Sequence, residues 1–187
     1  MRPAGTHGVT KRSRMIRFLR ATPVWLRMAI IPPIALSLYV AWYLASPLFL
    51  NTAVDEPFPT THAAQRLSPA DARRQAAVLR SGTFEGAHHN GRGNAYIFRL
   101  PDGRLILRFE RFRVTNGPNL YVYLSAHSKP VNSHDLHVYG AFEVAPLKGN
   151  IGPQNYELPA TLDLARYKSV AIYCRRFSVV FARARLA

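Results

Sequence analysis

The chain has 187 residues, of which 48% are hydrophobic and 19% charged, enough for one globular domain with additional segments. The formal net charge is +15, but seven of the 25 lysines and arginines lie in residues 1–27, and no acidic residue precedes Asp55. Because so much of the excess lies on a short N-terminal arm, the charge does not indicate a nucleic-acid-binding protein.

The first predicted element is a single-pass membrane anchor. Residues 28–50 contain no charged side chain, and a helix of this length spans about 34 Å, enough for a hydrocarbon core of about 30 Å. The arm 1–27 is basic, whereas Asp55 and Glu56 follow the span. The positive-inside rule therefore places the arm in the cytoplasm and the C-terminal domain outside, in the periplasm or extracellular space. A cleaved signal peptide and a buried helix of a soluble protein remain as alternatives.

Two short segments are expected between the anchor and the main domain. Residues 51–67 mix proline, threonine and small residues without periodicity, which predicts a linker. Residues 68–79 predict a short helix. In this helix Ser68 is the N-cap, Pro69 occupies the first helical position and Asp71 is the capping-box acid.

Residues 80–187 carry the pattern of an all-β domain. Segments rich in β-branched and aromatic residues are separated by turn sequences such as "PDG" and "NGPN". The pattern predicts an antiparallel β-sandwich or barrel-like domain of seven to nine short strands. The predicted strands are 94–100, 104–110, 111–115, 120–126, 137–145, 155–159, 169–174 and 177–186.

The only cysteine, Cys174, ends the predicted strand 169–174 and shares a face with Val170 and Ile172. One interpretation is a small buried hydrophobic side chain. The other is a working thiol, because the adjacent Arg175 and Arg176 favour a thiolate. The two arginines break the strand alternation, so "CRRF" predicts a bend or bulge in preference to a two-residue hairpin turn.

Histidines supply the other candidate chemistry. His88 and His89 lie in a loop rich in glycine and asparagine, and His134 and His137 form "HDLH". These pairs and Cys174 would have to meet at one end of the sheet to form a site. The Cys-x-x-Cys-His motif of covalent haem is missing, and so is the His that follows the Cys of a blue-copper centre. A haem or metal cofactor therefore stays unknown at this point.

The β region resembles the DM-thirteen domain, an electron-transfer family, over about 105 residues. This resemblance implies an all-β domain with Cys174 at the family's characteristic cysteine position. It also implies a redox role, in which the thiol acts bare or holds a prosthetic group such as haem. The chain departs from the family at Tyr173, where tryptophan is frequent, and at Ala182, where glycine is frequent. The resemblance is carried by "GTF" (82–84), "HHNGRGNAYIF" (88–98), "LPDGRLILRFERFRVTNGPNLYVYLS" (100–125), "LKGNIGPQNYELPA" (147–160) and "YKSVAIYCRRFSVVFARARL" (167–186).

Two functional hypotheses follow. The leading one is a membrane-anchored, extracytoplasmic redox domain, not a defined enzyme, that works with an envelope redox partner protein. In it Cys174 is the thiol or ligand, and His88 or His89 is the base or second ligand. The alternative is a non-catalytic envelope module that binds a partner protein or glycan through exposed aromatics such as Tyr121, Tyr123 or Tyr139. A Cys–His hydrolase has no local signature here.

The glycines of "NGP" and "GNIGPQN" are interpreted as scaffold, with a positive φ supplied in the first of these turns.

Overall fold

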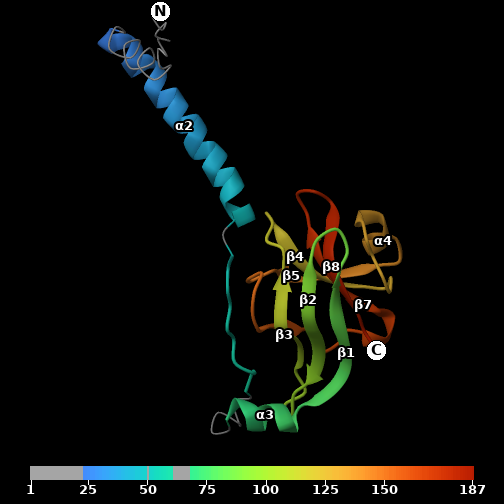
Figure 1. Cartoon of the computed structure of the whole chain (residues 1–187). Helices are drawn as coiled ribbons and strands as arrows, with labels where there is room; N and C mark the ends of the chain where they lie inside the picture. The colour runs from blue at the N-terminus through green and yellow to red at the C-terminus, as the bar shows by residue number, and fades with distance from the viewer. Residues whose placement is uncertain (1–22, 50, 61–67) are drawn as a thin grey trace, which may run out of the picture. The chain divides into compact units, whose positions relative to one another are not determined.

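The computed structural model describes residues 23–49, 51–60 and 68–187. The chain divides into two compact units, Met1–Ser46 and Pro47–Ala187. Most of the first unit's described part is a helix, and the second unit holds the β domain (Figure 1).

Helix α2 (Val24–Phe49) covers the predicted span 28–50 except for Leu50, which lies outside the described residues. Most of the predicted basic arm 1–27 lies outside them as well. In the part of the chain that the structure describes, no helix combines the length and the apolar character needed to cross a bilayer. Membrane anchorage therefore remains a prediction.

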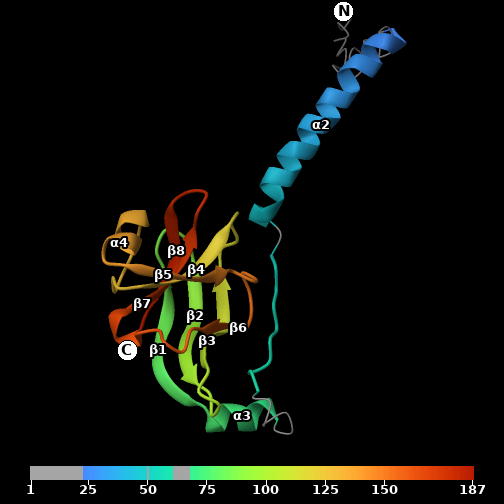
Figure 2. The same cartoon turned by 180° about the vertical axis from the view of Figure 1, so that it is seen from behind.

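The second unit is all-β, as predicted. Its described residues form the strands β1 (Ala77–Gly86), β2 (Gly91–Arg99), β3 (Leu105–Val114), β4 (Leu120–Ser125), β5 (Ala141–Pro146), β6 (Gln154–Leu158), β7 (Ser169–Cys174) and β8 (Val179–Arg185). These belong to one antiparallel sheet in the order β5-β4-β7-β8-β1-β2-β3-β6. The sheet curls until its edge strands β5 and β6 approach each other, which gives a nearly closed, barrel-like domain (Figures 1 and 2).

Strand β1 was not predicted, because "AVLRSGTFEG" lacks strict alternation and interrupts its apolar residues with glycine and polar side chains. Its first part pairs with β2 and its last part with β8, so it joins the two halves of the sheet. At this junction Gly82 has no room for a side chain, because an added Cβ would collide with the carbonyl of Arg185. Pairing of this kind depends on distant partners that local sequence does not reveal.

The predicted helix 68–79 is present but shorter, as α3 (Pro69–Gln75). Its start is as expected, since the Asp71 N–H donates to the Ser68 hydroxyl oxygen at 3.2 Å. It ends early because Ala77 already pairs with Arg99 in the sheet.

Two other predicted strands have different limits. Segments 104–110 and 111–115 form the single strand β3, which contains an irregularity where Arg111 has a φ of 50° and β2 contributes Gly93. The predicted strand 137–145 begins only at residue 141, because "SHDLHV" forms helix α4 (Ser133–Val138). The Asn132 side chain caps this helix by accepting the Asp135 N–H at 2.9 Å.

Residues 51–58, here called the strap, pack against the β domain, although a linker was expected for 51–67. The Val54 N–H donates to the Ile151 carbonyl at 2.9 Å, and the Glu56 N–H donates to the Pro153 carbonyl at 3.0 Å. Gly152 has a φ of +99°, and an added Cβ there would collide with the carbonyl of Val54. The strap is therefore part of the fold, while residues 61–67 lie outside the described part.

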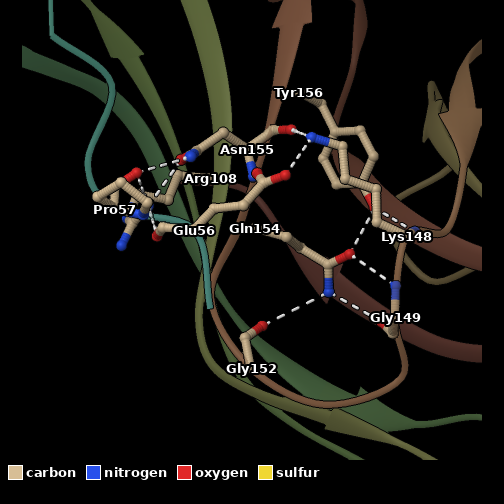
Figure 3. Close-up of polar contacts among 9 residues, drawn as sticks. All are labelled: Glu56, Pro57, Arg108, Lys148, Gly149, Gly152, Gln154, Asn155 and Tyr156. Atoms are coloured by element: carbon tan, nitrogen blue, oxygen red, sulfur yellow. Dashed lines mark hydrogen bonds and ion pairs between the residues drawn. The ribbon is translucent and has the colours of Figure 1, made fainter. Parts of the chain in front are cut away.

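A polar network holds the strap in place (Figure 3). Arg108, only 7% exposed, donates from Nη1 to the Glu56 carbonyl at 3.2 Å and to Asn155 Oδ1 at 2.7 Å. The Glu56 carboxylate accepts from Lys148 Nζ and from the Asn155 N–H, both at 2.7 Å. Phe58 is buried beneath and makes a T-shaped contact with Phe98.

The "GNIGPQN" loop is scaffold, as expected. Gln154 is completely buried, and its amide donates to the Gly149 carbonyl at 2.9 Å while its Oε1 accepts from the Tyr156 hydroxyl at 2.7 Å. The Tyr156 hydroxyl in turn accepts the Lys148 N–H at 3.1 Å (Figure 3). Burial raises the pKa of Tyr156, so this hydroxyl stays protonated as a donor.

The strap makes the stability of the domain dependent on pH through Glu56. Burial alone raises the pKa of this carboxyl, but the hydrogen bonds from Lys148 and Asn155 and the charge of Lys148 outweigh burial and lower it. Because the folded pKa lies below the unfolded value of 4.5, the carboxylate stabilises the fold above that pH. The stabilisation is lost as the pH falls through the folded pKa.

We therefore expect Glu56→Gln to lower the free energy of unfolding most near neutral pH, and the difference from the wild type to shrink below about pH 4.5. Chemical denaturation of the full chain in neutral detergent, followed by circular dichroism at a series of pH values, measures this. The exposed Glu157, mutated to Gln, is the matched control. Parallel pH curves for all three proteins would contradict the assignment.

Candidate functional site

Cys174 is sealed in the main core. It pairs with Leu120 of β4 and Val179 of β8, and its side chain is 0% exposed. Its Sγ–H donates to the Pro118 carbonyl at 3.1 Å. The predicted strand face is confirmed, because Val170 and Ile172 lie in the same core cluster. Of the two interpretations of this cysteine, the buried side chain is the one that these contacts match.

The connection after Cys174 differs from the expected bend or bulge. Residues 175–178 form a four-residue hairpin turn, in which Ser178 has a φ of 56°. The bulge lies farther along, in β8. There Ile172 pairs with Ala182 and Tyr173 with Val180, which leaves Phe181 as the extra residue. Both Phe181 and Ala182 therefore face the main core.

The loop 116–119, which carries the "NGPN" sequence, covers this end of the core. The positive φ expected in "NGP" is wrong for Gly117 and occurs instead at Asn119, with a φ of 62°. Gly117 is required for space, since an added Cβ would lie 2.6 Å from the ring of Phe181. The Pro118 carbonyl that follows is the acceptor for the Cys174 thiol. The loop therefore contacts the sulfur through Pro118 and the ring of Phe181 through Gly117.

His88 and His89 lie above the same end of the sheet. Their backbone N–H groups donate to the carbonyls of Val180 and Phe181, both at 3.1 Å. The His89 ring packs on the Phe181 ring with centroids 3.9 Å apart. Partial burial, with the charge of His88, lowers the pKa of His89. Within the described residues no hydrogen bond joins either imidazole to Cys174, whose sulfur bonds to the Pro118 carbonyl instead.

Arg175 does not lie beside the thiol, although the sequence analysis expected it to favour a thiolate there. Its guanidinium lies over the ring of Tyr121, 3.8 Å from the centroid, and donates to the Tyr123 hydroxyl at 3.2 Å from Nη2. It also pairs with Glu143. These partners lie on the face of β4 and β7 opposite Cys174. Arg176 is exposed in the turn.

The second histidine pair is also separated from Cys174. His137 packs edge-on against Tyr123 and Tyr173, with ring centroids 5.9 and 5.8 Å apart, on the opposite face of the sheet. His134 is exposed. Among the described residues no three His, Cys, Asp or Glu side chains gather as metal ligands would. Because Cys174 is completely buried and directs its proton to a carbonyl, its surroundings do not fit a haem or metal held by this sulfur.

A second feature was missed by sequence reasoning. A polar hollow of about 650 Å³, here called the arginine pocket, opens where β2 begins and β3 ends. Arg92 and Arg113 stand directly opposite each other there. No local signal marked this pair, because Arg92 precedes the predicted strand 94–100 and only Arg113 lies in a predicted strand, so their opposition appears only once the register is known. The pocket is lined by Asn51, Asn90, Gly91, Arg92, Arg113, Val114, Thr115 and Asn116.

Comparison with known proteins gives one match. The family model described as Electron transfer DM13 matches residues 83–186, which is more than half of the chain. Curated proteins yield no match, and neither do solved structures.

The contact of Gly117 with Phe181 predicts how the thiol is protected. We expect iodoacetamide to modify Cys174 slowly in the native chain. In Gly117→Ala the added methyl group displaces the loop, so alkylation should be about tenfold faster. Intact-protein mass spectrometry measures the rates. Gly103→Ala is the control for general destabilisation, because its added Cβ meets no atom within 4 Å and its φ of +87° confines the strain to the turn between β2 and β3. Equally faster alkylation in both variants would contradict the idea that the loop 116–119 protects Cys174.

Proposed function

We propose, because the chain belongs to the electron-transfer DM13 family, that it has a redox role in which Cys174 is a sealed thiol released by movement of the loop 116–119. The observation that carries this proposal is the hydrogen bond from the Cys174 sulfur to the Pro118 carbonyl. This bond brings the loop 116–119 into contact with the chain's single thiol, which stands where the resemblance to the family implies a characteristic cysteine.

The loop is suited to open without unfolding the domain. Besides the Cys174 thiol, the Arg175 N–H bonds to this loop, at the Asn119 carbonyl at 3.2 Å. Each such hydrogen bond contributes only about 1 kcal/mol to stability. Asn119 is exposed, and Asn116, Gly117 and Pro118 are partly exposed. Local opening of such a segment costs less free energy than global unfolding. A thiol held in this way reacts only while the loop is open.

The chemistry that fits a single bare thiol is exchange with the disulfide of an envelope partner protein. The Cys174 thiolate attacks one sulfur of that disulfide, a mixed disulfide forms, and the other sulfur leaves as a thiolate that takes up the released proton. Cys174 is thereby oxidised and the partner sulfur reduced. His89, whose pKa is lowered by burial and by His88, is the candidate base of the predicted pair, because its ring packs on Phe181, which the loop covers.

A second candidate function is a non-catalytic binding module, and the complete burial of Cys174 favours it. Of the aromatics expected to be exposed, Tyr139 is 62% exposed, Tyr121 is half-buried, and Tyr123 is buried with only 6% exposed. The binding surface of such a module would therefore include Tyr139 and exclude Tyr123.

We propose further that residues 28–50 hold the chain in a membrane, with the basic arm in the cytoplasm and the β domain outside. The support is the uncharged span and the seven positive charges before it. In addition, the described side chains of α2 between Met28 and Tyr43 are exposed all round the helix, and most are apolar. A helix that is apolar on every side needs an apolar environment.

The redox proposal is tested by incubating the reduced full chain with oxidised glutathione and measuring the mixed disulfide by mass spectrometry. We expect Cys174 to become glutathionylated in the folded protein, and Gly117→Ala to react faster. Cys174→Ser is the control that should acquire no adduct. A thiol that stays reduced until the domain unfolds would refute the redox proposal and favour the binding module.

The anchor is tested by alkaline carbonate extraction of membranes from cells that produce the full chain. We expect the wild type to stay in the membrane pellet. Ile34→Lys combined with Leu38→Lys should release it, since each charge at a helix centre costs about 3 kcal/mol of insertion free energy. Valine at the same two positions is the matched control. Extraction of the wild type itself would contradict anchorage.

A further inference from the structure

We propose that the arginine pocket binds a phosphate group, either of a lipid headgroup or of a soluble phosphate compound. The site goes beyond the redox role and needs no chemistry at Cys174. Its volume of about 650 Å³ is within the range of small-molecule pockets. Every side chain that lines it is neutral or positively charged.

The first argument is the charge at the mouth of the pocket. Arg92 and Arg113 face each other across an antiparallel pair, an arrangement that is destabilising for like charges. Neither guanidinium has an acidic partner among the described residues. The acids on the adjoining strands are already engaged, because Glu85 pairs with Arg183 and Glu110 pairs with arginines outside the pocket. An anion between the two arginines would relieve this repulsion.

The second argument is the set of uncharged donors around the arginines. Asn51 Oδ1 accepts from the Asn150 amide at 2.8 Å, which leaves the Asn51 NH₂ group available to a ligand. The side-chain amide of Asn90 has no partner in the described part of the chain. The pocket is therefore lined by hydrogen-bond donors from two strands and from the strap. A tetrahedral phosphate can accept hydrogen bonds from several directions, and arginine is the side chain best matched to it.

The position of Asn51 bears on where the phosphate comes from. It is the first residue after the proposed membrane span 28–50, so an anchored chain would hold the pocket within reach of lipid headgroups. The assignment of a lipid headgroup as the source of the phosphate rests on the proposed anchor. The phosphate site itself does not, since the residues that form it all belong to the second unit.

The experiment uses the full chain in a neutral detergent. Inorganic phosphate is titrated by calorimetry, and native mass spectrometry measures retention of phosphatidylglycerol compared with phosphatidylcholine. The test variant is Arg92→Gln with Arg113→Gln. The control is Arg99→Gln with Arg176→Gln, which removes the same charge from exposed positions outside the pocket. Circular dichroism checks that each variant is folded.

We expect the test variant to bind phosphate at least tenfold more weakly than the wild type, and the control to stay within about twofold. Wild type that binds neither probe, or equal losses in both variants, would overturn the site. Retention of phosphatidylglycerol that is lost only in the test variant assigns the headgroup as the source. A dependence seen only with inorganic phosphate overturns the headgroup and retains the site. Cys174→Ser should bind like wild type, which separates this result from failure of the redox role.

Discussion

The packing of Phe181 is the contact on which the candidate site depends. Its ring lies between the imidazole of His89 and the backbone of Gly117, and it closes the core at the Cys174 end. Phe181 reaches this place because β8 carries a bulge there. Strict alternation from Phe181 would send Arg183 into the core. The extra residue lets Phe181 face inward and still turns Arg183 to the outer face of the sheet, where it pairs with Glu85 and donates to the Pro130 carbonyl.

The sequence predicts the parts of this site that depend on local pattern. Alternation along β7 gave the correct face for Cys174, and the Ser68 cap gave the correct start of α3. The remaining features depend on contacts between distant residues. Gly117 is required by the ring of Phe181, and the strap is held by Arg108, which lies about fifty residues away. Neither of these contacts can be identified from the sequence alone, because both depend on the register of the sheet.

A sealed thiol has different properties from an exposed one. An exposed thiolate reacts with any oxidant that reaches it, whereas a thiol under a loop reacts only as often as the loop opens. Arg175 lies on the far face with Glu143 and is not available to activate the sulfur while the loop is closed. In the proposed redox role, loop opening and not a neighbouring charge would therefore set the reactivity of Cys174.

The strap is the segment that links the β domain to helix α2. Asn150 donates to the Asn51 side chain at 2.8 Å and to the Val114 carbonyl at 3.1 Å, so it fixes the start of the strap to the end of β3 beside Arg113. The arginine pocket is therefore built from both segments. The matched family region begins at residue 83 and lacks Asn51 and Phe58. A phosphate bound there would contact both segments. Its binding would therefore stabilise the packing of the strap against the β domain.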